Sequence, residues 1–172
     1  MTNLVDPHGA KTLKPLIIKD NSEKNNIISN SNSLFKLRLN SAAAANAVML
    51  GAGYFTPLEG YMNKNNAISV SENMVMSDGL FWPVPIVNLT KEDVSSVQVG
   101  DEIALLDPNV EHNPILAVQQ VEAIEQMSDD ELSSMASNIF GTNDSEHPGV
   151  KNFISLGNTL ISGYIKVLNY SY

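Results

Sequence analysis

The chain has 172 residues, 43% of them hydrophobic, and ten Lys and Arg stand against nineteen Asp and Glu, a formal net charge of −9. This length is typical of one domain, so we expect a single domain over residues 1–172. The absence of cysteine excludes disulfides and thiol chemistry, and the acidic balance argues against nucleic acid as a partner. A membrane-spanning helix needs about 18 consecutive apolar residues, and no apolar run in the sequence is that long. The N-terminus also lacks the apolar core of a signal peptide. We therefore expect a cytoplasmic protein without a membrane segment.

The first third of the chain predicts a strand, a loop, a second strand and a helix. Residues 13–18 form a short apolar run, whose proline is typical of an edge strand. Residues 20–33 are rich in Asn, Ser and Lys, which indicates a surface loop. Residues 34–39 alternate apolar and polar side chains, as half-buried strands do. Residues 42–50 favour a helix, which Asn40 or Ser41 would cap and Gly51 would end.

The middle of the chain predicts a short helix over residues 63–74 and a turn at 77–79. Trp82 follows, between residues that prolines hold extended. Trp82 could stack on a ligand, but a core or interface anchor is the better interpretation. Strands are expected over residues 86–89, after the turn at Gly100, and over 115–124, with a loop over 111–114.

The last third predicts a helix and a final strand. Ser128 and Glu131 form a capping-box pattern, and five apolar residues after it recur on one helical face, namely Leu132, Met135, Ala136, Ile139 and Phe140. Gly141 would end this helix. A short helix is expected around residues 150–154, ended by Gly157. Residues 159–168 form a final strand, interrupted at Gly163. Short strands with short helices indicate an α+β fold.

Only a small number of polar residues are candidates for a functional site. Asp144, Glu146 and His147 could together hold a metal, but their spacing fits no zinc pattern, and a hydrogen-bonded loop is the better interpretation. His8 could be a ligand, although a turn histidine is the better interpretation. Arg38 is the only arginine, which nearly excludes a site built on bidentate arginine–anion contacts.

The stretch 51–62 is the most informative part of the chain and reads Gly-Ala-Gly-Tyr-Phe-Thr-Pro-Leu-Glu-Gly-Tyr-Met. Its glycines, proline and large apolar residues predict a helix end followed by a buried corner. A dinucleotide loop is rejected, because that fingerprint needs a strand before it and a helix after it. The stretch resembles the G-x-G-G-F-[ST]-P-L-x-G-F-M signature of the ATP sulfurylase (sulfate adenylyltransferase) family, with Tyr54 in place of Gly and Tyr61 in place of Phe.

Four more segments resemble motifs of that family, in the same order along the chain. Residues 6–9 read Asp-Pro-His-Gly, 79–86 read Gly-Leu-Phe-Trp-Pro-Val-Pro-Ile, 100–105 read Gly-Asp-Glu-Ile-Ala-Leu, and 140–150 begin Phe-Gly-Thr and end His-Pro-Gly-Val. The chain is thereby identified as similar to the family's N-terminal domain. The form of these motifs looks closest to that of the bacterial and archaeal family members that act in dissimilatory sulfur metabolism.

This resemblance implies a PUA-like pseudo β-barrel with short flanking helices. The family makes adenosine 5′-phosphosulfate and diphosphate from ATP and sulfate, with ATP and Mg²⁺ bound at a separate catalytic domain. That domain's Q-T-R-N-P-x-H-x-x-H-E segment is absent here, and Glu111-His112-Asn113-Pro114 is only a superficial match. We therefore assign no catalytic, cofactor-binding or metal-binding residue, and expect the chain alone to be inactive.

Three interpretations follow. In the first, the chain is the structural N-terminal domain of a sulfate adenylyltransferase, with that enzyme's catalytic domain as partner and with contacts in a homo-oligomer. In the second, it is a stand-alone PUA-like binding module without catalytic activity. In the third, it binds a small molecule at the aromatic corner. We also predict that the corner 53–62 and the segment 79–86 are mostly buried and lie close together, with Phe55 in the core.

Overall fold

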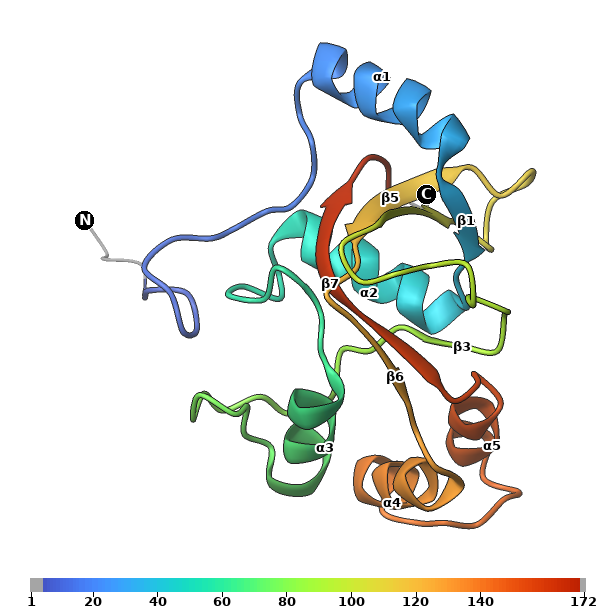
Figure 1. Ribbon diagram of the computed structural model, residues 1–172. Coiled ribbons are helices and arrows are strands. Elements are labelled where there is room, and N and C mark those ends of the chain that lie inside the picture. Colours follow the sequence, from blue (N-terminus) through green and yellow to red (C-terminus); the bar gives the residue numbers. More distant parts are fainter. Residues whose placement is uncertain (1–4, 171–172) are drawn as a thin grey trace. The chain divides into compact units, whose positions relative to one another are not determined.

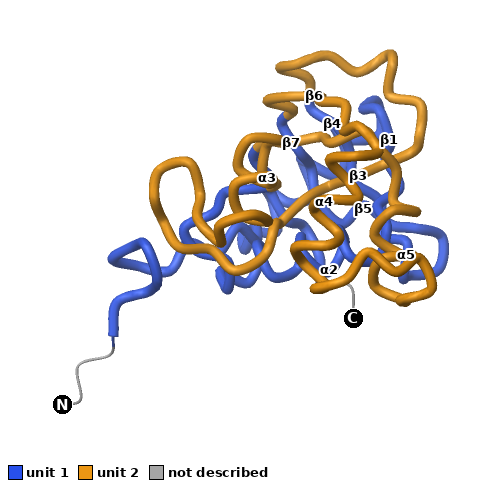
Figure 2. The backbone as a smooth tube through the Cα atoms, turned by 90° about the horizontal axis from the view of Figure 1, so that it is seen from below, with its two compact units in different colours: residues 1–60, 102–120, 164–172 blue, residues 61–101, 121–163 orange. Residues whose placement is uncertain are grey.

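The computed structural model describes residues 5–170, in which short helices and short strands follow one another in mixed order (Figure 1). The α+β prediction is confirmed. The described chain forms two compact units, shown in blue and orange in Figure 2. Unit 1 contains the described residues up to Gly60, then 102–120, then those from Tyr164 onward. Unit 2 contains residues 61–101 and 121–163.

Unit 1 is built on a mixed sheet. Strand β1 (Phe35–Arg38) pairs in parallel with β4 (Glu102–Leu106), which pairs antiparallel with β5 (Ile115–Gln120). Strand β5 in turn pairs antiparallel with the second half of β7 (Thr159–Val167). The alternation predicted for residues 34–39 is confirmed, because Leu37 is fully buried whereas Lys36 and Arg38 are exposed.

Helix α2 (Ser41–Ala52) packs against β5 of this sheet. Its first turn is capped as predicted, since the Asn40 side chain accepts a hydrogen bond from the Ala43 N–H at 2.9 Å. The predicted end at Gly51 is wrong, because the helix runs on to a left-handed Gly53 with φ 83°. Gly51 is instead buried inside the helix, where an added Cβ would lie 2.9 Å from Val167 Cγ1.

The predicted loop over residues 20–33 is also wrong. It forms helix α1 (Asn21–Asn30) and a 3-10 turn over Ser31–Ser33. Asp20 caps α1, accepting the Glu23 N–H at 2.7 Å, and no residue of the helix is buried. Residues 13–18 make only an isolated bridge, from Ile17 to Val167, rather than a strand.

Unit 2 has the first half of β7 at its centre. Strands β3 (Leu89–Thr90) and β6 (Ala123–Gln126) pair antiparallel with that half, one on each side. Helices α3 (Lys64–Asn73), α4 (Asp129–Phe140) and α5 (Pro148–Ile154) complete the unit. Their apolar faces share one core with the strands, whose buried members include Ala67, Leu89, Leu132, Met135, Phe153 and Leu160.

Several details of unit 2 differ from expectation. The strand predicted over 115–124 divides into β5 and β6, with Val121 and a bend at Glu122 between them. Strand β7 is not interrupted at Gly163, whose φ of 141° lies within the strand. The capping box of α4 and its end at Gly141 are confirmed. A short strand, β2 (Gly60–Tyr61), lies where the chain first passes between the units. In the described part of the chain, no helix is long and apolar enough to traverse a bilayer.

Candidate functional site

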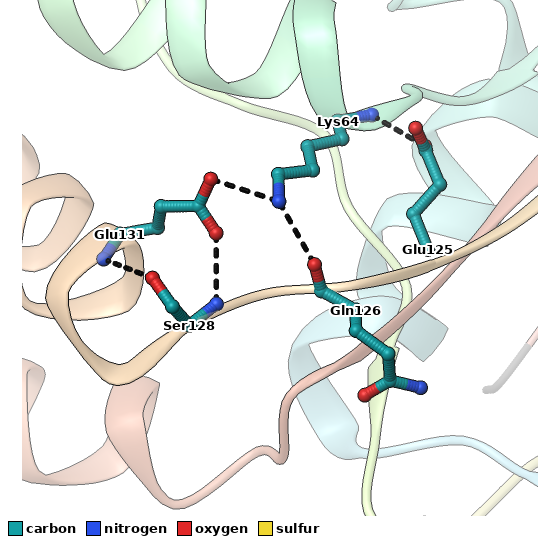
Figure 3. A network of polar contacts seen from close by, with 5 residues as sticks. All are labelled: Lys64, Glu125, Gln126, Ser128 and Glu131. Atoms are coloured by element: carbon teal, nitrogen blue, oxygen red, sulfur yellow. Dashed lines mark hydrogen bonds and ion pairs between the residues drawn. The ribbon is translucent and has the colours of Figure 1, made fainter.

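Unit 2 contains a polar cluster that joins the first turns of α3 and α4 to strand β6 (Figure 3). Lys64 Nζ lies 2.8 Å from Glu131 Oε1 and donates to the main-chain oxygen of Gln126 at 2.9 Å. The main-chain N–H of Lys64 donates to Glu125 Oε2 at 2.8 Å. Ser128 and Glu131 exchange two hydrogen bonds at the start of α4, of 2.8 and 3.2 Å. The sequence predicted the capping box but not Lys64, because residues from separate helices meet here.

The electrostatics of this cluster are those of a structural contact. The hydrogen bond from the Lys64 ammonium, followed by that from the Ser128 N–H, lowers the pKa of Glu131 below its usual range. A carboxylate held ionised in this way does not donate or accept a proton near neutral pH, as a general acid or base must. Asp93 has a similarly lowered pKa, caused by hydrogen bonds from Ser95.

The three histidines lie in different turns or bends of the chain. His112 is exposed with φ 66°, and its Nε2 lies 3.5 Å from Glu111 Oε1. His147 caps α5, because its Nδ1 accepts the Val150 N–H at 3.4 Å. His8 is exposed in the turn where the Ala10 N–H donates to the Pro7 oxygen. Within residues 5–170, none of the three belongs to a group of side chains that could hold a metal ion.

The loop interpretation of residues 144–147 agrees with the structure. Asp144 Oδ1 accepts the Glu146 N–H at 2.9 Å, and the Asp144 main-chain oxygen accepts the His147 N–H at 3.0 Å. The Phe140 ring lies 5.7 Å from the His147 ring, between their centroids. The residues of this motif therefore connect α4 to α5 and hold that connection in shape.

The prediction for the glycine-rich corner and the Trp82 segment is correct only in part. The Met62 N–H donates to the Ile86 oxygen at 2.9 Å, so these ends of the two stretches do meet within unit 2. Trp82 is buried, as predicted for an anchor. Phe55, however, is only half-buried. Tyr54, Phe81 and Val84 are exposed, so the prediction that both stretches are mostly buried was wrong for these side chains.

Tyr61 is the buried titratable group of the corner. Its side chain is 4% exposed, and desolvation raises the pKa of its phenol well above the usual range. The hydroxyl is therefore neutral at physiological pH. A neutral phenol provides no charge for an anionic substrate.

Two shallow grooves flank α4 in unit 2. One has a volume of about 210 Å³ and is lined from α3 and α4 by residues that include Ile68, Glu72, Asp130 and Met135. The other has a volume of about 420 Å³ and lies between α4 and the chain that follows α5, with Leu132, Ile154 and Asn158 in its lining. Neither lining contains a Lys, Arg or His. The sequence did not indicate these grooves.

The charge of the chain is divided unequally. Unit 1 carries seven Lys or Arg and seven Asp or Glu, whereas unit 2 carries three Lys and twelve Asp or Glu, so unit 2 accounts for the whole net charge of −9. A nucleotide with Mg²⁺ needs cationic donors around its phosphates and oxygen ligands for the ion. Neither of the two grooves fits such a group, because both offer carboxylates without cations.

Comparison with known proteins places the chain. A family model for a PUA-like domain matches residues 5–170. The sulfate adenylyltransferase of Alcanivorax borkumensis is 51% identical over all of this chain, which covers 43% of that protein. Those of Allochromatium vinosum and of the Riftia pachyptila sulfur-oxidizing endosymbiont are 46% and 40% identical over 98% of this chain, and 42% and 38% of those proteins are covered. The chain thus spans less than half the length of these curated relatives.

Among solved structures, a hexameric APS kinase from Thiobacillus denitrificans has a similar fold, with a TM-score of 0.69 and 20% sequence identity. The matched region covers 98% of this chain and 27% of the APS kinase chain. That likeness supports the fold. The family model covers the described residues from β1 to β7, together with the helices between them. The chain belongs to the PUA-like domain family, in the form that makes up the N-terminal part of sulfate adenylyltransferases.

Proposed function

We propose that this chain is the N-terminal structural domain of a sulfate adenylyltransferase and supports the catalytic part of that enzyme without carrying its chemistry. The observation that supports this most directly is the 51% identity to the Alcanivorax borkumensis enzyme over the whole chain, against 43% coverage of that protein. In this proposal the remaining part of the enzyme binds ATP, sulfate and Mg²⁺. The enzyme acts in the cytoplasm as a homo-oligomer.

The chemistry of the described residues supports a structural role. Attack of sulfate on the α-phosphate of ATP needs preorganised positive charge where charge develops. Arg38, the only arginine, is exposed on a strand of unit 1. Lys64 is engaged by Glu131 in unit 2. Because unit 2 is strongly acidic, it also lowers the local concentration of anionic substrates.

The test is an exchange of domains. This chain replaces the matching N-terminal part of the Alcanivorax borkumensis enzyme, and the joined protein is compared with the 172-residue chain alone. Formation of ATP from adenosine 5′-phosphosulfate and diphosphate, followed by luminescence, reports the reverse reaction. We expect turnover by the joined protein and none by the chain alone, beyond a heat-killed control.

Turnover by the repurified chain alone would overturn the non-catalytic assignment. A joined protein that folds but lacks activity would overturn the supporting role. The stand-alone module is tested separately by gel-shift titration with mixed RNA. We expect no binding at physiological salt, and micromolar, salt-sensitive binding would favour that alternative.

A further inference from the structure

The segment Met74–Val84 of unit 2 forms a short hairpin after α3, which we call the apolar hairpin. The Met76 N–H donates to the Leu80 oxygen at 2.8 Å, and the Trp82 N–H donates to the Met74 oxygen at 2.8 Å. Val75 and Phe81 form an antiparallel bridge between the two arms. Figure 1 shows this light green segment extending away from α3 before the chain returns towards β3.

This hairpin exposes large apolar side chains while its base is fixed. Phe81, Met74 and Val84 are 54%, 51% and 41% exposed. The base is held by the buried Trp82, and by the Ser69 hydroxyl, which donates to the Val75 oxygen at 2.6 Å. A surface that is already ordered loses little conformational freedom when it binds, which favours recognition.

The composition of the apolar hairpin is that of an interface core. Asp78 is its only charged residue, although unit 2 carries three Lys and twelve Asp or Glu in total. Methionine and aromatic residues are enriched at the buried centre of protein interfaces, and charged residues are depleted there. An exposed segment with this composition in an otherwise acidic unit is therefore suited to contact another protein surface.

The backbone at Met74 points independently to a role for its side chain. Met74 ends α3 in the left-handed conformation with φ 54°, whereas Gly53 and Gly141 occupy the same position at the ends of α2 and α4. Glycine adopts this conformation without the steric cost that a side chain incurs. Since Met74 is half exposed, packing within the unit does not fully account for a methionine here.

We infer that the apolar hairpin is the surface by which this domain docks onto the remaining part of the same enzyme chain. The inference rests on the proposed function. More than half of the Alcanivorax borkumensis relative lies outside the matched part, since the match covers 43% of that protein. The occupant is therefore a covalently attached protein surface with an apolar recess, into which the three side chains fit.

The size of the apolar hairpin favours an attached partner over a second copy. A large side chain has about 150–250 Å² of accessible surface when it is fully exposed. Three such side chains, each about half exposed, therefore offer a contact area on the order of 300 Å². A stable complex of separate chains needs about 800 Å² on each side. Attachment raises the effective concentration of the partner to the millimolar range, so a smaller surface is sufficient.

Oxidation of methionine to its sulfoxide measures whether the surface is covered. The 172-residue chain and the joined full-length protein described above are treated with hydrogen peroxide, and sulfoxide at each methionine is followed by mass spectrometry. The readout is the rate at Met74 relative to Met49, a 36% exposed methionine of unit 1. We expect this ratio to fall at least about fivefold in the full-length protein, because burial blocks the oxidant. An unchanged ratio overturns the inference.

Matched variants identify the surface. Val84→Asp is compared with Val99→Asp, since Val99 is 66% exposed in the same unit but lies outside the hairpin. In the full-length protein, Val84→Asp should restore the ratio seen for the chain alone, and Val99→Asp should not. Equal effects of the two variants would overturn the inference. Both variants should leave the thermal midpoint of the chain alone unchanged, because both side chains are exposed there.

Met74→Gly separates binding from stability. It relieves the left-handed strain, so the midpoint of the chain alone should stay the same or rise, whereas the midpoint of the full-length protein should fall. A lower midpoint for the chain alone would assign Met74 a packing role within the unit and overturn the inference.

Two further outcomes distinguish this inference from the proposed function. An active full-length protein without protection of Met74 leaves the proposed function standing and overturns the docking surface. Protection without activity supports the docking surface and overturns the proposed function. Protection that rises with the concentration of the chain alone would assign the surface to a second copy and overturn the inference.

Discussion

Lys64 Nζ lies 2.8 Å from Glu131 Oε1 and thereby links the first turn of α3 to the first turn of α4. Both side chains are partly exposed, at 26% and 32%. Exposed ion pairs contribute little to stability in general, but this one also carries a hydrogen bond to the Gln126 oxygen. The contact therefore fixes the two helix starts relative to strand β6, all within unit 2.

The first prediction concerns pH. The pKa of Glu131 is lowered in the folded state, first by the hydrogen bond from Lys64, so the unfolded state binds its proton more readily. The stabilisation is present above the unfolded pKa of about 4.3 and is lost as pH falls through the folded pKa. Urea midpoints of the wild type and Glu131→Gln should differ at neutral pH and converge in acid. The prediction would be contradicted if the difference in urea midpoint between the wild type and Glu131→Gln did not change with pH. It would also be contradicted if the exposed variant Glu72→Gln gave the same difference.

The second prediction concerns the α4 cap. Ser128 Oγ accepts the Glu131 N–H, and Ser128→Ala leaves that donor without its partner at the helix start. We expect a loss of about 1 kcal/mol in the free energy of unfolding. Ser133→Ala, at an exposed position of the same helix, is the control and should be neutral. Equal losses would show that hydroxyl removal, rather than capping, is responsible.

The third prediction separates backbone strain from steric overlap at two glycines. Gly157 has φ 112°, and an added Cβ would lie 2.3 Å from the Thr90 carbonyl carbon. Gly79 has φ 89°, with nothing within 4 Å of that position. Gly79→Ala should cost about 1 kcal/mol of unfolding free energy from strain alone. Gly157→Ala should cost more than about 3 kcal/mol, because backbone atoms must move as well. Denaturant titration measures the unfolding free energy of both variants. Equal losses of unfolding free energy in the two variants would contradict this account.

The fourth prediction concerns alkaline pH. Burial raises the pKa of Tyr61 in the folded state, so its contribution to stability is full below the unfolded pKa of about 10 and is lost above it. We expect the unfolding midpoint of the wild type to fall above pH about 10 more steeply than that of Tyr61→Phe. Tyrosinate absorbance should show this residue ionising together with unfolding. Ionisation of all tyrosines before the loss of circular dichroism would contradict the prediction.

Elements with strong local signals could be predicted from the sequence. The capping box at Ser128 located α4, and the alternation around Leu37 located β1. Helix α1 was missed, because Asn and Ser dominate it and it buries no residue. The signal was nevertheless present, since Asp20 precedes Glu23 at capping-box spacing.

The site could be predicted less well, for a physical reason. The density of aromatic, proline and glycine residues around Trp82 showed that this segment packs against protein, and Trp82 is indeed buried. Composition does not distinguish side chains buried within the unit from those left exposed, so the exposure of Phe81 and Val84 could not be foreseen. Likewise, the pairing of Lys64 with Glu131 depends on how two helices from separate parts of the chain meet.

Strand β7 supplies its first half to unit 2 and its second half to unit 1. During synthesis on the ribosome, residues 159–167 follow every other strand of the described chain, so neither unit can complete its hydrogen-bonded ladder until this one segment has emerged. Such distant pairing slows folding and leaves earlier strands with open edges meanwhile. Since the chain passes between the units four times, no single cut in the gene would yield either unit whole.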